Sequence, residues 1–158
     1  MSFSITSTAF NEGGPIPVQH TCDGADLSPP LAWSGVPQGT GAFALIADDP
    51  DAPGRTWVHW VLYDVPATLG GLPENVSKAE APRDLGGAVQ GRNDSRDVGY
   101  GGPCPPPGPA HRYFFKLYAL AAPLGLKPGA SNQDVERAMG GHVLATAQLM
   151  GTYARQRR

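Results

Sequence analysis

The sequence contains little charge. Charged residues make up 16% of its 158 residues, and the formal net charge is −2 with an isoelectric point near 6.0. Such a chain has no electrostatic reason to bind nucleic acid, and we expect no nucleic-acid partner. Its one basic cluster lies at the C-terminal end and is interpreted as a solvated tail made of Arg155, Arg157 and Arg158.

Long hydrophobic runs are also missing. No apolar run approaches the roughly 18 residues that a membrane-spanning helix needs. The first ten residues, MSFSITSTAF, have neither a basic segment nor a long apolar one, so we expect no signal peptide. These observations predict a cytoplasmic protein without a membrane span.

Cysteine is scarce, with only Cys22 and Cys104 in the chain. Two cysteines are too few for a disulfide scaffold, and this pair lacks the close spacing of zinc ligands. We therefore expect reduced thiols, with a single disulfide bridge as the alternative.

Glycine and proline, in contrast, are abundant. The chain has 21 glycines and 17 prolines, while 41% of its residues are hydrophobic. That composition is too apolar for a disordered chain and is rich in turns. No repeat or low-complexity linker divides it, so the sequence predicts one mainly β domain over residues 1–158.

Three segments predict central strands of a packed, antiparallel, β-sandwich-like fold. They are GAFALIADD at 41–49, RTWVHWVLYDV at 55–65 and HRYFFKLYAL at 111–120. Aromatic and aliphatic residues dominate them, and Gly/Pro clusters bound them.

In each predicted strand, alternate residues share one face, and each of these faces contains polar side chains in addition to apolar ones. The predicted faces are Phe43, Leu45, Ala47 and Asp49; then Trp57, His59, Val61 and Tyr63; and then His111, Tyr113, Phe115 and Leu117.

The C-terminal segment predicts short helices. Ser131 and Asp134 have the spacing of an N-terminal cap, and strand alternation stops after them. Gly140 and Gly141 should divide the segment into helices near 132–139 and 142–155. An apolar stripe on the second helix would pack on the sheet or form a homodimer contact, through Val143, Leu144, Ala147, Met150 and Ala154.

Polar residues that could bind a ligand lie where the predicted strands begin or end. Asp49 precedes Pro50, which cannot continue a ladder, and His111 and Tyr113 share a face at the start of their strand. If the three strands are neighbours, these residues and His59 converge in one pocket.

Such a set suits an anion. Imidazole N–H groups, a phenol O–H and loop amides are donors that can surround an oxyanion, and Asp49 can orient a histidine and hold it cationic. Five prolines between 103 and 109 would stiffen the adjoining loop and leave the N–H of Gly102 or Cys104 free to point inward.

Purely structural roles fit several of these residues when each is taken alone. His59 between two tryptophans suits a hydrogen-bonded core histidine, and Asp51 suits a turn residue bonded to its own backbone. His142 should be packed or cap a helix, and His20 should be exposed. Core positions are expected for Trp33, Trp57 and Trp60.

These motifs together resemble the phosphatidylethanolamine-binding proteins. The matching segments are DPDAP, the WVHW strand, and GYGGPCPPPG followed by HRYFF. CDGADLSPPLAWSGVP at 22–37 and GGHVLATAQLMGTYAR at 140–155 also resemble the bacterial, Raf-kinase-inhibitor-like branch of that family.

The resemblance implies a β-sandwich-like fold with a small anion pocket for phosphate-like head groups. Matched residue by residue, it implies ligand-binding roles for Asp49, His59, His111 and Tyr113, with a loop amide near Cys104. Between DPDAP and WVHW only three residues intervene, where the eukaryotic branch has a longer insertion. Kinase inhibition therefore transfers less readily than the fold and pocket.

The leading hypothesis is a protein that binds a phosphate-like or carboxylate ligand and modulates a signalling partner, kinase or protease. It requires no cofactor, metal or catalytic residue. One alternative is a hydrolytic enzyme using Cys104 with His111, or Asp49 with His59. The others are a two-histidine, one-carboxylate metal site at Asp49, His59 and His111, and a protein acting through its surface.

Overall fold

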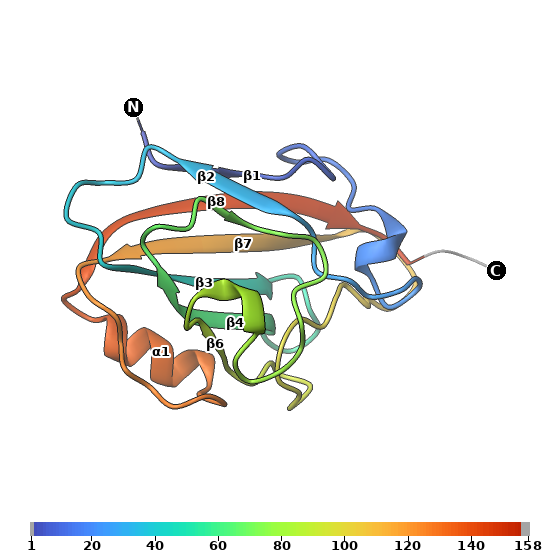
Figure 1. Ribbon diagram of the computed structural model, residues 1–158. Helices are drawn as coiled ribbons and strands as arrows, with labels where there is room; N and C mark the ends of the chain where they lie inside the picture. Colours follow the sequence, from blue (N-terminus) through green and yellow to red (C-terminus); the bar gives the residue numbers. More distant parts are fainter. Residues whose placement is uncertain (1, 156–158) are drawn as a thin grey trace.

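The computed structural model describes residues 2–155 as two packed antiparallel sheets and a short α-helix (Figure 1). The smaller sheet has the order β1-β2-β5 and the larger one β6-β4-β3-β7-β8. The strands are β1 (Ser4–Thr6), β2 (Leu31–Ser34), β3 (Ala42–Asp49), β4 (Trp57–Pro66), β5 (Gly71–Leu72), β6 (Val89–Gln90), β7 (His111–Leu120) and β8 (Val143–Tyr153). The helical elements are the 3-10 turns η1 (Val18–His20) and η2 (Arg83–Leu85) and the helix α1 (Asn132–Met139).

The three strands predicted from the sequence are confirmed as β3, β4 and β7. β3 lies between the other two, and every one of its residues is buried. This central position explains its near-continuous apolar sequence. The mainly β, antiparallel fold class is thereby confirmed.

Two hydrophobic cores cover the two faces of the larger sheet. Between the sheets, Trp33 of β2 packs with Phe43 of β3, at a ring-centroid distance of 5.2 Å, in the core that also contains Trp60 and Phe115. On the opposite face lies α1, in the position that Figure 1 shows below β3 and β4. The second core there is formed by Ala44, Ile46, Val58, Val61, Tyr63, Leu120, Val135 and Met139.

β4 carries an extra residue opposite the end of β3. Ala47 pairs with Trp60 and Asp48 pairs with Val58, so His59 has no partner on β3. Such a bulge changes the alternation of side chains. The prediction that His59 shares a face with Val61 and Tyr63 is therefore wrong, because those two lie in the core beneath α1 while the His59 ring contacts Tyr113 on the other face.

The helix α1 begins where the sequence predicts. Ser131 accepts a hydrogen bond from the backbone N–H of Asp134, whose side chain accepts one from the N–H of Ser131. This reciprocal cap satisfies donors that would otherwise be unpaired at the helix start. The helix ends at Met139, as expected for 132–139.

The second predicted helix, 142–155, is wrong, because this segment forms β8. It pairs with β7 from the contact between His111 and Tyr153 to that between Leu120 and Val143. Alternate residues near its end, Leu149, Gly151 and Tyr153, are buried. Pairing along the whole of β7 outweighs a weak local helix pattern, so the helix that was expected to carry the apolar stripe does not form.

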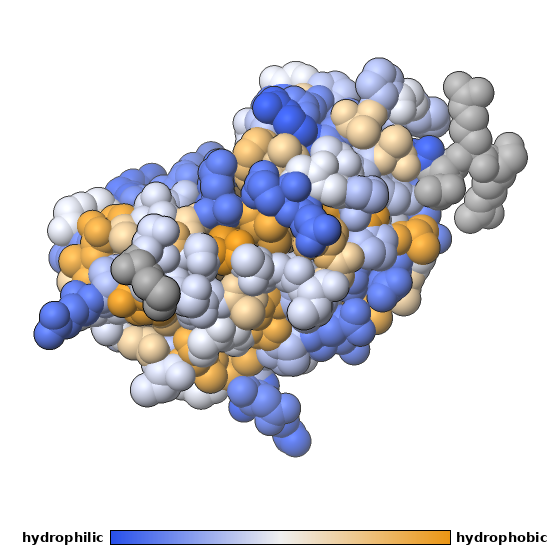
Figure 2. Space-filling model, turned by 90° about the horizontal axis from the view of Figure 1, so that it is seen from above, coloured by the Kyte–Doolittle hydropathy of each residue, from blue (hydrophilic) through white to orange (hydrophobic). Residues whose placement is uncertain are grey.

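Figure 2 shows the molecule from above the view of Figure 1, with hydrophobic residues interspersed among hydrophilic ones. The large hydrophobic side chains with appreciable exposure include Val18, Val36, Val143 and Leu144. Within residues 2–155, no helix has the length and apolarity needed to cross a membrane.

Several single-residue expectations are settled by burial. Trp33 and Trp60 are core residues as predicted, but His20 is fully buried and its predicted exposure is wrong. Its ring Nδ1 hydrogen-bonds the carbonyl of Leu27, which allows the imidazole to be buried. His142 is exposed in the turn before β8 and caps no helix start, because the strand β8 follows it directly.

The predicted basic tail has a described and an undescribed part. The Arg155 guanidinium lies 3.4 Å from the Asp23 carboxylate, so this residue is paired with the body of the protein. Arg157 and Arg158 lie outside the described residues.

Gly151 of β8 provides a test of the packing between β8 and the N-terminal segment. A Cβ added there would lie 2.6 Å from Ile16 and 2.7 Å from Phe10. We expect Gly151→Ala to lower the free energy of unfolding by about 1–3 kcal/mol, measured by urea denaturation, because the buried neighbours must move. Gly70→Ala is the control, since nothing lies within 4 Å of the added Cβ. Equal effects of the two substitutions would contradict this packing.

Candidate functional site

A cavity of about 710 Å³ lies where β3 ends and β4 and β7 begin. Asp49, His59, His111 and Tyr113 all line it, together with Cys104. The predicted convergence of side chains from distant parts of the chain is therefore present in the geometry.

Asp49 positions His111 at one side of the cavity. Its Oδ2 lies 2.7 Å from His111 Nδ1, and its Oδ1 accepts the backbone N–H of Asp51 at 2.8 Å. Both side chains are largely buried. Because the carboxylate can only accept, it fixes the proton of His111 on Nδ1 and leaves Nε2 as the other polar atom of the ring.

A backbone carbonyl orients His59 in the same way. Its Nδ1 lies 2.7 Å from the oxygen of Gly101 and therefore donates to it. Burial lowers the pKa of His59, an effect partly opposed by this hydrogen bond and by nearby carboxylates including Asp49. In the neutral form, His59 presents an unprotonated Nε2; in the cationic form, it presents a donor.

Tyr113 lies between the two imidazoles. Its ring centroid is 5.4 Å from that of His59 and 6.4 Å from that of His111. The residue is 2% exposed, and no group among residues 2–155 makes a hydrogen bond of ordinary geometry with its hydroxyl. Burial, followed by the Asp49 carboxylate, raises its pKa well above the usual range, so the hydroxyl keeps its proton as a donor.

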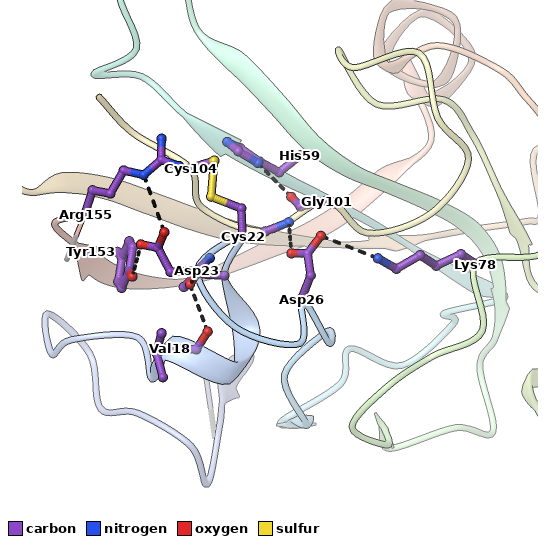
Figure 3. Close-up of a disulfide and its surroundings, with 12 residues drawn as sticks. Val18, Cys22, Asp23, Asp26, His59, Lys78, Gly101, Cys104, Tyr153 and Arg155 are labelled. Carbon is purple, nitrogen blue, oxygen red and sulfur yellow. Dashed lines mark hydrogen bonds and ion pairs between the residues drawn. A yellow bond between two sulfur atoms is a disulfide. The ribbon is translucent and has the colours of Figure 1, made fainter. Parts of the chain in front are cut away.

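The expectation that both cysteines are reduced is wrong. Cys22 and Cys104 form a disulfide across a sequence separation of 82 residues, with their Cα atoms 5.4 Å apart. Figure 3 shows this bond joining the segment after η1 to the segment that contains Gly101. A disulfide-bonded sulfur is no thiolate, so the hydrolytic alternative with Cys104 as nucleophile is contradicted in this state.

The backbone amide of Gly102, which was predicted to be free to point inward, already donates a hydrogen bond within the protein. It donates to Oδ1 of Asp26 at 2.8 Å. The same carboxylate lies 3.6 Å from Lys78 Nζ, in the ion pair drawn in Figure 3. Asp26 and Lys78 line the cavity but were not predicted as site residues. Asp26 has a positive φ of 61°, and an aspartate in the turn-like CDGAD segment was the only signal for it.

The prediction that the Asp51 side chain bonds the backbone of its own turn is wrong. This side chain instead fixes the start of β7. Its carboxylate accepts from the backbone N–H and from the guanidinium of Arg112 at 2.9–3.0 Å. These hydrogen bonds lower the pKa of Asp51 to about 2. The turn is instead closed by Asp49, which places the adjoining β7 residue, His111, beside it.

The geometry does not support the metal-site alternative. Within residues 2–155, no group of three or more His, Cys, Asp or Glu side chains is arranged to hold a metal ion. Asp49 directs one oxygen to His111 and the other to a backbone amide, so it is occupied without His59. The alternative of a hydrolytic enzyme that uses Asp49 with His59 is likewise unsupported, because no hydrogen bond joins these two side chains among the described contacts.

Apolar side chains form much of the remaining wall. Trp57, predicted as core, is only partly buried and lines the cavity. The other apolar lining residues include Ala52, Pro53, Val58, Val98, Pro105 and Pro106.

Comparison with known proteins identifies the family to which this arrangement belongs. The phosphatidylethanolamine-binding protein family model matches residues 6–154. A UPF0098 protein of Methanothermobacter thermautotrophicus is 54% identical over 152 residues, covering 96% of this chain and 99% of that protein. Another from Aquifex aeolicus is 50% identical, covering 96% and 88%.

Solved structures agree with this relationship. YbcL of E. coli, described as a member of the mammalian PEBP family, has a TM-score of 0.91 and 36% identity, with 99% of this chain and all of YbcL covered. A PEBP homologue from Chlamydia trachomatis has a TM-score of 0.89 and 38% identity, covering 98% and 99%. The chain belongs to the phosphatidylethanolamine-binding protein family.

The lowered pKa of His59 can be measured directly. In an NMR pH titration of the ligand-free protein, we expect the His59 imidazole to titrate below the ordinary value of about 6.5, because burial disfavours its charged form. His59→Gln assigns the signal. As pH falls, the unfolded chain takes up this proton first, so His59 contributes a loss of stability below about pH 6.5. Titration of His59 at or above the ordinary value would contradict the described burial.

Proposed function

We propose that this protein binds a small oxyanion, such as phosphate or a phosphorylated head group, between His59, His111 and Tyr113. The single observation that carries the proposal is the Tyr113 hydroxyl, which is buried, unpaired and placed beside two imidazoles in a cavity. A buried hydroxyl without a partner costs about 1–3 kcal/mol, and an acceptor oxygen on a ligand would remove that cost.

The protonation of the two imidazoles decides which charge the pocket prefers. Each Nδ1 is already bonded to an acceptor, so Nε2 becomes a donor only when the ring is cationic. An anion therefore binds together with protons, or donates its own proton to a neutral Nε2.

The apolar wall suggests a ligand larger than the anion alone. Trp57, Val58, Val98 and Pro106 line the same cavity as the polar cluster. Burying an apolar substituent against them would add binding free energy of about 25 cal/mol per Å². A phosphate monoester or carboxylate with an attached apolar group fits both parts of the cavity.

The physiological role follows the resemblance to the Raf-kinase-inhibitor-like branch. In this proposal the occupied pocket modulates a signalling partner, kinase or protease in the cytoplasm, and anion binding is the event to which the partner responds. Neither a cofactor nor a catalytic residue enters this role.

Tyr113→Phe tests the central contact. We expect phosphate affinity, measured by isothermal titration calorimetry, to fall about tenfold or more, because a hydrogen bond to a charged group is lost. The ligand-free variant should be more stable than the parent by about 1 kcal/mol, because an unpaired buried hydroxyl is removed.

The matched control is Tyr118→Phe, since Tyr118 lies on the same strand and packs against the opposite core. That change should leave phosphate affinity unchanged. Unchanged affinity in Tyr113→Phe, or equal losses in both variants, would refute the proposed contact.

The pH dependence of binding provides an independent test. Sulfate is the probe, because its charge does not change in the range examined. Burial keeps the pKa of His59 below its ordinary value, and a bound anion raises it, so binding takes up a proton. Sulfate affinity should therefore increase as the pH falls from about 8 to about 5, with the gain concentrated below about 6.5. Affinity that is flat or rises with pH would contradict cationic imidazoles as the anion donors.

A further inference from the structure

The loop after Gly101 forms one wall of the cavity and makes few contacts of its own. Its five prolines, within residues 103–109, have no backbone N–H to donate. In the described chain, no hydrogen bond joins residues 104–110 to any other segment. Nevertheless, Pro105 is buried, and Pro105 and Pro106 both line the cavity.

The Cys22–Cys104 disulfide is the bond that attaches this loop. Cys104 is the first residue of the unbonded stretch, and its partner lies in the segment just after η1. Immediately before Cys104, residues 100–103 are held by hydrogen bonds that include Cys22 N–H to the Pro103 carbonyl, Gly102 N–H to Asp26, Gly101 N–H to the His59 carbonyl, and the Tyr100 hydroxyl to the His20 carbonyl. The covalent anchor thus begins where the hydrogen bonds end.

Both cysteines are exposed and both line the cavity. A small thiol can therefore reach the bond from solvent, and accessible disulfides are the ones that exchange readily. Neither sulfur belongs to the two hydrophobic cores that hold the sheets together.

We infer that the Cys22–Cys104 disulfide is a redox switch for the anion pocket, so that the protein binds its anion in the oxidised form and releases it on reduction. This inference rests on the proposed function. A dithiol supplies the two electrons and two protons: its sulfurs become a cyclic disulfide, and the protein's S–S bond becomes two thiols.

The physical consequence of reduction is local. The hydrogen bonds up to Pro103 remain, and both cores are untouched, so the sheets stay folded. Residues 104–110 lose their attachment, the Pro105–Pro106 wall becomes mobile, and the following residue, His111, is carried by a chain that is fixed on one side only. An anion must then order the loop on binding, which lowers its affinity.

Linkage gives the inference a quantitative form. If reduction weakens phosphate binding by some factor, saturating phosphate must shift the dithiol–disulfide equilibrium toward the protein disulfide by the same factor. A disulfide that merely stabilises the fold, without touching the site, has no such reciprocal effect.

The experiment compares inorganic phosphate binding by the oxidised protein, the protein reduced with a dithiol, and the Cys22→Ser/Cys104→Ser variant. We expect the last two to bind about tenfold more weakly than the first, within the usual range of coupled sites. Circular dichroism should show the same β content for all three. The serine variant is the matched control, because dithiol should not change its affinity.

The outcomes separate the two proposals. If the oxidised protein does not bind phosphate, the proposed function is wrong. If the oxidised protein binds phosphate, the redox switch is refuted by either of two results. In one, the reduced protein and the serine variant bind phosphate as tightly as the oxidised protein does. In the other, phosphate fails to protect the disulfide from reduction. Global unfolding on reduction would also refute the redox switch, since the bond would then hold the fold and not the pocket wall.

Discussion

One extra residue in β4 determines whether the site exists. Regular pairing would direct the side chains of β4 alternately to the two sheet faces, and the inserted His59 breaks that order opposite Ala47 and Asp48. As a result, Trp60 packs in the core between the sheets while His59 stands beside Tyr113 at its edge. Bulges often occur beside binding sites because they redirect a side chain without altering the strands around it.

The polar cluster is prepared for a ligand by the acceptors behind it. The Asp49 carboxylate and the Gly101 carbonyl each fix Nδ1 of one histidine, so Nε2 is the ring nitrogen that remains available for a ligand. The Tyr113 hydroxyl, in contrast, makes no hydrogen bond of ordinary geometry within residues 2–155, although the Asp49 carboxylate lies near it. The pocket therefore combines two oriented imidazoles, which can be neutral or cationic, with a hydroxyl donor that can bind an oxygen of the ligand.

The central strands and the cap of α1 could be predicted from the sequence, because side-chain alternation and the Gly and Pro residues that bound each strand are local signals. The family and the convergence of Asp49, His59, His111 and Tyr113 could be predicted from the motifs at the ends of these strands. The sequence was insufficient where long-range contacts decide. The segment of β8 has a local helix pattern that its pairing with β7 overrides, the two cysteines are 82 positions apart in the sequence, and Asp26 is held at the cavity by its bond to Gly102. Burial of His20 likewise depends on its hydrogen bond with the Leu27 carbonyl, which no sequence pattern predicts.

The most direct test of the central claim is nitrogen NMR of the histidine side chains during addition of phosphate near neutral pH. If the anion binds between these side chains, Nε2 of both His59 and His111 shifts toward the protonated form in a saturable manner, while the buried His20 and the exposed His142 keep their signals. Saturable binding that leaves the His59 and His111 nitrogens unchanged, or no binding at all, would show that these imidazoles do not hold the anion.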